Sequence, residues 1–179
     1  MNRLEMNELQ TSRLLIERFT ESDAGFIVEL LNDPGWLRFI GDKKVRTLDD
    51  ARQYLHAGPL AMYEERGFGL CRVSRRADGL ALGMCGLLKR DGLDDIELGF
   101  AFLPEGRGQG YAREAAAAVI EFGFESLAAP RIVAITNSEN AASARVLEGV
   151  GMHFDRVVSL PPEGREVRLY AIEADRAGA

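Results

Sequence analysis

The chain has 179 residues, of which 46% are hydrophobic, and this length and composition suit one compact domain with a sizeable core. Its formal net charge of −6 excludes a global positive field that would draw the protein to nucleic acid. No stretch approaches the ~20 apolar residues that a membrane span needs, and the polar N-terminus lacks an apolar core of signal-peptide length. We therefore expect a cytoplasmic protein, monomeric or homodimeric, with no nucleic-acid or membrane partner.

We place a single domain at residues 11–174, because no internal repeat, low-complexity tract or linker divides the chain. Alternation of Leu14 and Ile16 with polar residues in TSRLLIERFT predicts a first strand. The stretch ESDAGFIVELLNDP predicts a helix that is capped near Ser22 and ended by Pro34.

A second helix begins in TLDDARQYLHAG, capped by Thr47 or Asp49, and the Gly58-Pro59 pair breaks or kinks it. Three strand-like runs follow: GFGLCRVSRR, ALGMCGLLKR and DIELGFAFLP. The short links between them, residues 77–79 and 91–92, are hairpin signals, so we expect an antiparallel meander.

The last third of the chain alternates again between helix and strand patterns. An alanine-rich helix is expected over about 108–127, and Gly123 weakens it for no reason that the sequence shows. The apolar run RIVAITN is typical of a strand buried on both faces. A helix in NAASARVLEGVG is capped at Asn140 and closed by Gly149 or Gly151, and two strands with a turn at 161–164 end the domain.

Cysteine and histidine give no sign of a metal or redox site. Cys71 and Cys85 are isolated within apolar runs, which predicts buried, reduced thiols. His56 and His153 have no partner at ligand spacing, so we expect no metal.

The stretch PEGRGQGYAREAA, residues 104–116, carries three glycines at alternate positions where a strand gives way to a helix. One glycine would serve a plain turn, and that interpretation stays open. Three glycines would also let backbone N–H groups converge at a helix N-terminus, which attracts phosphate. Arg107 and Arg113 flank the glycines and could add positive charge. The spacing nevertheless fails the dinucleotide fingerprint, and no Gly-Lys-Ser/Thr ending of a Walker loop is present.

The stretch AFLPEGRGQGYAREA, followed about 30 residues later by NSENAASARVLEGVGM, resembles the GNAT superfamily of acyl-CoA-dependent N-acetyltransferases. Together with the opening LQTSRLLIERFTESDA, it is most similar to the branch that contains the ribosomal-protein N-terminal acetyltransferases. The resemblance covers nearly the whole chain. It implies an α/β fold with a mixed, mostly antiparallel sheet flanked by helices and with splayed central strands.

The resemblance also implies acetyl-CoA as co-substrate and a set of contacts to it. The end of the strand before the loop would pair with the pantetheine arm, and backbone N–H groups of the loop would hold the pyrophosphate. The asparagine before the later helix would touch the cofactor as well. In this sequence the cofactor-binding residues would be Ala101, Phe102, Leu103, Arg107, Gly108, Gln109, Gly110, Tyr111, Ala112 and Asn140.

Three positions depart from the family pattern. Glu105 stands where many members have Gln or Arg, and Leu147 stands where many have a tyrosine that acts as general acid. Ile135 replaces a glutamate that serves others as base. These departures concern catalysis more than cofactor binding.

Glu97 is our candidate for the base, because its face of the strand carries the small residues Gly99 and Ala101. A solvated strand carboxylate is the alternative. The resemblance places Ser143 beside the thioester, where its hydroxyl could assist the leaving thiolate, although it could instead bond the backbone near Asn140. A backbone N–H near Phe100 or Ala101 could stabilise the oxyanion.

The leading hypothesis is therefore transfer of an acetyl group to a primary amine, either a protein N-terminus or a small-molecule amine, by direct attack in a ternary complex. A non-catalytic acyl-CoA-binding or sensing domain is the alternative, and a nucleotide-binding module unrelated to acyl transfer is a third. An acceptor wall is expected from residues 32–50, which include Trp36 and Phe39, and from the turn at 161–164. Trp36 could instead be a core anchor.

Overall fold

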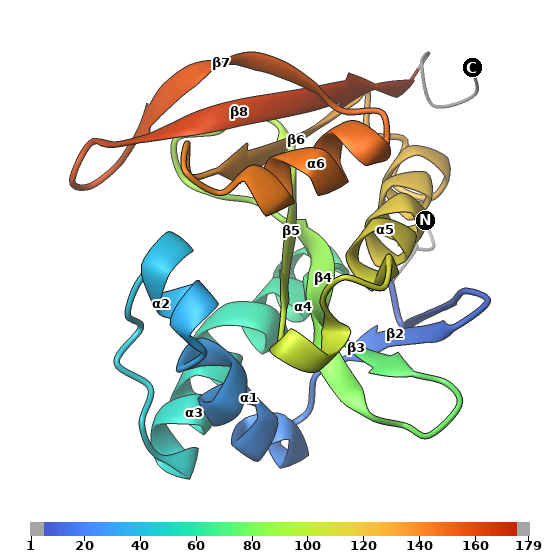
Figure 1. The fold of residues 1–179 in the computed structure, drawn as a ribbon, viewed down its shortest axis with the longest axis vertical. Helices are drawn as coiled ribbons and strands as arrows, with labels where there is room; N and C mark the ends of the chain where they lie inside the picture. Colours follow the sequence, from blue (N-terminus) through green and yellow to red (C-terminus); the bar gives the residue numbers. More distant parts are fainter. Residues whose placement is uncertain (1–5, 175–179) are drawn as a thin grey trace.

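A computed structural model describes residues 6–174 of the chain, so part of the polar N-terminal stretch lies outside the described residues. Within this range one eight-stranded sheet has the order β1-β2-β3-β4-β5-β6-β8-β7 (Figure 1). Every neighbouring pair is antiparallel except β5 and β6, which are parallel. The predicted mixed, mostly antiparallel sheet flanked by helices is confirmed.

The strands are β1 (Glu8–Gln10), β2 (Leu14–Arg18), β3 (Leu70–Arg75), β4 (Ala81–Leu88), β5 (Ile96–Phe102), β6 (Arg131–Thr136), β7 (His153–Leu160) and β8 (Arg165–Glu173). The α-helices are α1 (Ala24–Leu31), α2 (Pro34–Phe39), α3 (Leu48–Leu55), α4 (Ala61–Arg66), α5 (Tyr111–Glu125) and α6 (Ala141–Gly149). Shorter helical turns are η1 (Glu21–Asp23), the π-helix η2 (His56–Leu60) and η3 (Pro104–Gly106).

The first helical region differs from its prediction at both ends. Its cap is Thr20 rather than Ser22, because the Thr20 backbone N–H donates to the Asp23 carboxylate at 2.8 Å. Pro34 does not merely end α1. It begins α2, where a proline at the first helical position costs no hydrogen bond. Neither α2 nor β1 was predicted, because six and three residues are too short for a periodic pattern.

The second helical region is longer than its prediction. Thr47 caps α3 through a reciprocal capping box with Asp50. Of the two effects predicted for the Gly58-Pro59 pair, a break is wrong: η2 continues the helix as a π-helix, an irregularity in its course, that leads directly into α4. A wider turn suits this site because Pro59 has no N–H to donate and its ring crowds the turn before it.

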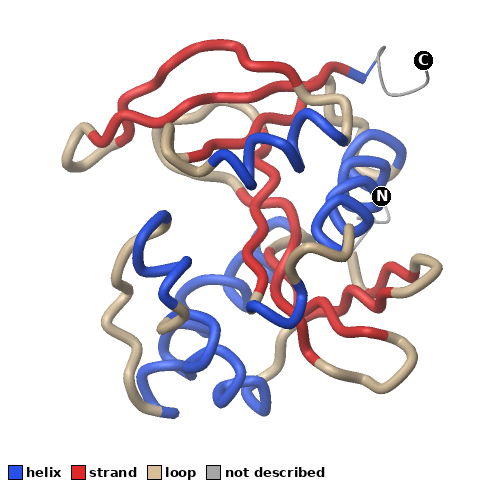
Figure 2. The backbone as a smooth tube through the Cα atoms, viewed as in Figure 1, coloured by secondary structure: helices blue, strands red, loops and turns tan. Residues whose placement is uncertain are grey.

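Helices cover both faces of the central strands, as Figures 1 and 2 show. Helix α5 lies on one face, where Ala115, Ala116 and Val119 are fully buried. Helices α1 and α3 pack on the other face. Gly123 now has a physical explanation, since a Cβ atom there would lie only 2.6 Å from Ile132 Cδ1. The glycine lets α5 approach the sheet.

The two parallel strands at the centre diverge soon after they meet. Strands β5 and β6 pair only at Ile96 with Ile132 and at Glu97 with Val133. Beyond Glu97, β5 keeps its pairing with β4 alone, as far as Phe102. The expected splay of the central strands is therefore confirmed.

Both cysteines are buried and free, as expected, and they face each other across β3 and β4. Burial raises the pKa of the Cys71 thiol to about 12 and raises that of Cys85 as well. Among the helices of residues 6–174, none has the length and apolar character to cross a membrane.

Candidate active site

The edge of β5 that faces away from β4 is open beyond Glu97. The Leu103 N–H donates to the Leu82 carbonyl on the β4 side at 2.8 Å. Successive residues of a strand direct their backbone groups to opposite edges, so Ala101 also faces β4 whereas Phe100 faces the open edge. Of the two backbone N–H groups predicted as oxyanion donors, only that of Phe100 is available.

The glycine loop continues from this open edge. Gly108 and Gly110 adopt the left-handed φ values of +72° and +81°, which favour glycine. Gly106 has a different role, because a Cβ there would meet Phe102 Cδ1 at 2.9 Å and Leu82 Cβ at 3.1 Å. The backbone N–H groups of residues 108–113 have no acceptor within residues 6–174. Six unpaired donors therefore gather at the N-terminus of a 15-residue helix.

The turn between β1 and β2 fastens this helix N-terminus. Glu114, in the first turn of α5, accepts from the Thr11 hydroxyl at 2.6 Å, the Arg13 backbone N–H at 2.9 Å and Arg13 Nε at 2.7 Å. Arg13 also donates to the Gln109 carbonyl at 2.9 Å and lies 4.4 Å above the buried Tyr111 ring. We call Thr11, Arg13 and Glu114 the hairpin clamp, which the sequence did not reveal.

Glu97 is not a solvated strand carboxylate. Its side chain is 3% exposed and accepts two hydrogen bonds from Arg90, to Oε2 at 2.6 Å and to Oε1 at 3.1 Å. Burial raises the pKa of Glu97 above its ordinary value, and the Arg90 charge opposes that rise. There is less room beside it than expected, since a Cβ on Gly99 would touch Leu88 and Leu70.

Ser143 and Asn140 lie at the start of α6, which packs against α5 and β6. The Asn140 side chain accepts from the Ser143 backbone N–H at 3.1 Å, so the helix cap is Asn140. The Ser143 hydroxyl makes no hydrogen bond with residues 6–174, and the alternative of a backbone bond near Asn140 is wrong for that hydroxyl. Leu147 is fully buried in the core.

Comparison with known proteins identifies the family. The family model described as the Acetyltransferase (GNAT) domain matches residues 13–153. This chain belongs to the GNAT acetyltransferase family. It is similar to "Uncharacterized N-acetyltransferase YnaD" of Bacillus subtilis (strain 168), with 31% identity over 92% of this chain and 95% of that protein.

Solved GNAT structures share this fold. A GNAT-family acetyltransferase from Bacillus anthracis has a TM-score of 0.77 and 26% identity, over 94% of this chain and 99% of that one. RimL, titled a ribosomal L7/L12 alpha-N-protein acetyltransferase in complex with coenzyme A, has a TM-score of 0.80 over 95% of this chain and 99% of its own. At 14% identity the RimL likeness shows the fold alone. The chain is thus an acetyl-CoA-dependent N-acetyltransferase.

The side chains beside the loop of this GNAT domain differ in their availability. Arg107 is already engaged, because its backbone N–H donates to Pro104, its Nε donates to the Phe102 carbonyl at 2.9 Å, and its guanidinium pairs with Asp33. Both its backbone N–H and its guanidinium would have to leave these partners to bind a phosphate. Arg113 is exposed against Gly149 of α6 and forms no ion pair with residues 6–174.

One residue beside the predicted turn contacts the other segment that is expected in the acceptor wall. Arg165, next to the predicted turn, donates to the carbonyls of Phe39 at 2.6 Å and Ile40 at 3.0 Å, at the end of α2. Trp36 belongs to the core, since it is 5% exposed and its Nε1 donates to the Gly41 carbonyl at 3.1 Å. Of the two interpretations of Trp36, the core anchor is correct.

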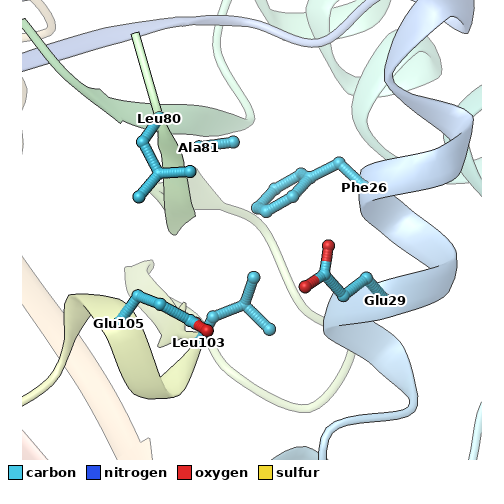
Figure 3. Close-up of a pocket in the computed structure, with 6 residues that line it drawn as sticks. All are labelled: Phe26, Glu29, Leu80, Ala81, Leu103 and Glu105. Atoms are coloured by element: carbon cyan, nitrogen blue, oxygen red, sulfur yellow. The ribbon is translucent and has the colours of Figure 1, made fainter. Parts of the chain in front are cut away.

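A cavity of about 290 Å³ lies near the end of β5, between α1, η3 and the start of β4 (Figure 3). Phe26 and Glu29 face Leu103 and Glu105 across it. Two carboxylates would repel a phosphate, so this cavity does not suit the cofactor's anionic end. Among the described residues no group of His, Cys, Asp and Glu side chains is arranged to hold a metal ion.

Within residues 6–174, Glu97 and Ser143 share no hydrogen bond, and they belong to different faces of the sheet. Glu97 lies on the sheet face covered by α3, whereas Ser143 starts a helix whose buried Leu147 packs with α5 on the opposite face. Beyond Glu97, where β5 and β6 no longer pair, the opening between these strands connects the two faces of the sheet. The sequence did not indicate that Arg90 and Tyr54 belong to the surroundings of Glu97. Burial raises the pKa of Tyr54 to about 12, and the positive charge of Arg90 opposes that rise.

The hairpin clamp leads to a first prediction. Glu114→Gln should lower the free energy of unfolding by about 1 kcal/mol at pH 7, because Arg13 is 44% exposed and the ion pair is screened. It should also weaken CoA binding about three- to tenfold through a looser loop. Burial alone would raise the Glu114 pKa, but the Thr11 and Arg13 hydrogen bonds outweigh it and lower that pKa.

A depressed carboxyl pKa stabilises the fold above the ordinary value of 4.5, and this contribution disappears as the pH falls through the folded-state pKa. Thermal melts from pH 3 to pH 7 should therefore show the Glu114→Gln deficit shrinking toward acid pH. Glu121→Gln, at an exposed position on the same helix, is the control. A deficit that is independent of pH would contradict the clamp's electrostatic role.

Proposed function

We propose that this enzyme transfers an acetyl group from acetyl-CoA to a primary amine by direct attack in a ternary complex. One observation carries the proposal: the open edge of β5 runs into a loop with six unpaired N–H groups at a helix N-terminus. A strand-like pantetheine arm would fit the edge, and a pyrophosphate would fit the loop. The open strand edge and the loop are also consecutive in the chain, so one extended cofactor could contact both.

The cofactor contacts divide between backbone and side chains. The N–H groups of residues 108–112 would hold the pyrophosphate, with the exposed Arg113 close by. The segment from Ala101 to Leu103 would flank the pantetheine arm, and its accessible edge begins at Phe100. Asn140 uses its side-chain oxygen as a cap, which leaves its amide nitrogen to reach the cofactor.

The reaction needs a neutral amine, a polarised thioester carbonyl and a stabilised leaving thiolate. The amine nitrogen attacks the carbonyl carbon, the C–N bond forms and the C–S bond breaks. Glu97 would take the proton that the nitrogen loses, and the raised pKa of this buried carboxylate suits it to do so. The Phe100 N–H would stabilise the oxyanion, and the Ser143 hydroxyl would donate to the CoA thiolate.

The test is CoA release with purified protein, acetyl-CoA and a panel of amines. The panel contains peptides with free and with blocked N-termini, small amines and aminoglycosides. Acetylation of free but not blocked peptides would identify a protein N-terminus as acceptor, in keeping with the alpha-N-protein acetyltransferase activity for which RimL is named. CoA binding without turnover of any amine would favour the acyl-CoA sensor. Cytoplasmic localisation and the absence of a metal remain predictions.

Ser143→Ala tests the role of the hydroxyl. A CoA thiol needs little help in leaving, so kcat should fall only 10- to 100-fold, or roughly 1.4–2.7 kcal/mol. The melting temperature should not change, because the cap uses the Ser143 backbone N–H, which alanine keeps. Ser138→Ala, at an exposed position before α6, is the control. Full turnover by Ser143→Ala would leave the serine without a chemical role.

A further inference from the structure

A second cavity, of about 300 Å³, lies on the sheet face that carries Glu97. Helices α3 and α4 and the π-helix between them form its roof, and strands β3 and β4 form its floor. The lining residues that matter here are Tyr54, Gly58, Pro59, Met62, Leu70 and Leu88. No charged side chain of residues 6–174 lines it, so its interior suits an apolar group.

The π-helix η2 supplies part of the roof of this cavity. A π-helix adds a residue to the turn and is frequent at functional sites. Gly58, within it, has no atom within 4 Å of the position that its Cβ would occupy. Because Gly58 lines the cavity, a side chain added there has room beside the cavity wall.

The cavity borders the Glu97–Arg90 pair. Leu88 in the floor is the direct cross-strand partner of Glu97 on β5, so the two side chains leave the same face of the sheet as neighbours. The Leu88 and Leu70 side chains also cover Gly99, two residues farther along β5. At the roof, the charge of Arg90 acts on the Tyr54 hydroxyl.

We propose that this cavity holds an aliphatic or aromatic substituent of the acceptor amine, so that the enzyme prefers amines with an apolar group. The proposal rests on the proposed function, since it assumes that the amine reaches Glu97. A polycationic acceptor would leave charges unpaired against an apolar lining, at a high desolvation cost. The apolar group can belong to a small amine or to the first residue of a peptide.

Binding of n-alkylamines to the CoA-bound, full-length protein tests the cavity without any chemistry. Calorimetry with ethylamine, butylamine and hexylamine should show affinity rising about fourfold for each added methylene, the effect of burying one CH₂ group. All three amines carry the same charge, so the change in affinity with chain length reports only the burial of the alkyl group. No dependence of affinity on chain length would overturn the proposal.

Gly58→Leu should fill the cavity and flatten that slope, because the position is open and needs no positive φ. Gly25→Leu is the matched control: Gly25 is also a helical glycine with open space around it, in α1, and this variant should keep the slope. Should Gly58→Leu fail to fold, Met62→Gln makes the same cavity polar and should reduce the slope. A wild-type slope in either folded cavity variant would overturn the proposal.

Turnover separates this proposal from the proposed function. Peptides that differ only in an N-terminal Leu or Ser, each free or blocked, are compared with hexylamine and ethanolamine in CoA release. Selective use of the free Leu peptide indicates a peptide acceptor, and selective use of hexylamine indicates a small amine. If affinity rises with the length of the alkylamine but no amine is turned over, the proposed function is wrong and the cavity assignment stands. Equal turnover of apolar and polar acceptors would overturn the cavity assignment alone.

Discussion

Gly110→Val is expected to weaken CoA binding at least 100-fold, or about 2.7 kcal/mol. Gly110 caps α5 at a φ of +81°, which a β-branched residue adopts only under strain. The loop must therefore rearrange, and the N–H groups of residues 108–113 would no longer converge. Each charge-assisted hydrogen bond lost is worth roughly 1.5–3 kcal/mol, so the loss of one or two accounts for the effect. Titration calorimetry with CoA measures it.

Gly79→Val separates backbone strain from the loss of the phosphate site. Gly79 has a similar φ of +73° in the hairpin between β3 and β4, and a Cβ there would meet no atom within 4 Å. This control should lose stability, as Gly110→Val does, but keep its affinity for CoA. If Gly110→Val folds and binds CoA as tightly as the wild type, the loop does not hold the pyrophosphate.

Glu97→Gln is expected to lower kcat/KM about 100-fold or more, which is the lower end of what a general base contributes. In the wild type, kcat/KM should rise with pH through the Glu97 pKa, which burial places above the ordinary value of 4.5, because the base must be ionised. The variant should lack this rise. The pH–rate profiles of both proteins, with single-turnover rates at saturating acetyl-CoA, provide the measurement.

The same shift has the opposite consequence for stability. A carboxyl group whose pKa is raised by folding contributes stability below its ordinary pKa, and this stability is lost as the pH rises through the folded-state pKa. Glu97→Gln should therefore be no less stable than the wild type above that pH, since Arg90 is 39% exposed and can be solvated. Loss of activity together with a stable fold would indicate chemistry rather than misfolding.

The outcome that would contradict this role is an unchanged single-turnover rate in Glu97→Gln. Glu97 would then be only the buried partner of Arg90. Glu166→Gln, at an exposed position on β8, controls for the loss of one negative charge and should leave the profile unchanged.

The fold was largely predictable because its long elements have clear periods. The meander β3–β5, the strand β6 and the helix α6 with its Asn140 cap all appear where the pattern places them. The misses are local: β1 and α2 are too short for a period, and η2 depends on how helices pack around Pro59. Gly123 was unexplained because its reason, Ile132, is a tertiary contact.

The part of the candidate site that consists of backbone groups, the glycine loop, was predictable from the sequence. Glycines at fixed spacing indicated the loop, and its unpaired N–H groups are what such a loop supplies. Side-chain partners were not predictable in the same way. The ion pair that joins Arg107 to Asp33 and the contact between Arg13 and Glu114 link positions far apart in the sequence. No local pattern reports such pairs.

The placement of Arg107 has a consequence for how the two substrates influence each other. Asp33 accepts from Arg107 and also caps α2, through the N–H groups of Gly35 at 2.9 Å and Trp36 at 3.2 Å. At its other end, α2 is held by Arg165. This helix is thus a strut between the cofactor loop and the β7–β8 turn. Any movement of the loop on CoA binding would therefore be passed to α2 and would change the affinity for an acceptor that contacts α2. By thermodynamic reciprocity, binding of that acceptor would change the affinity for CoA by the same factor.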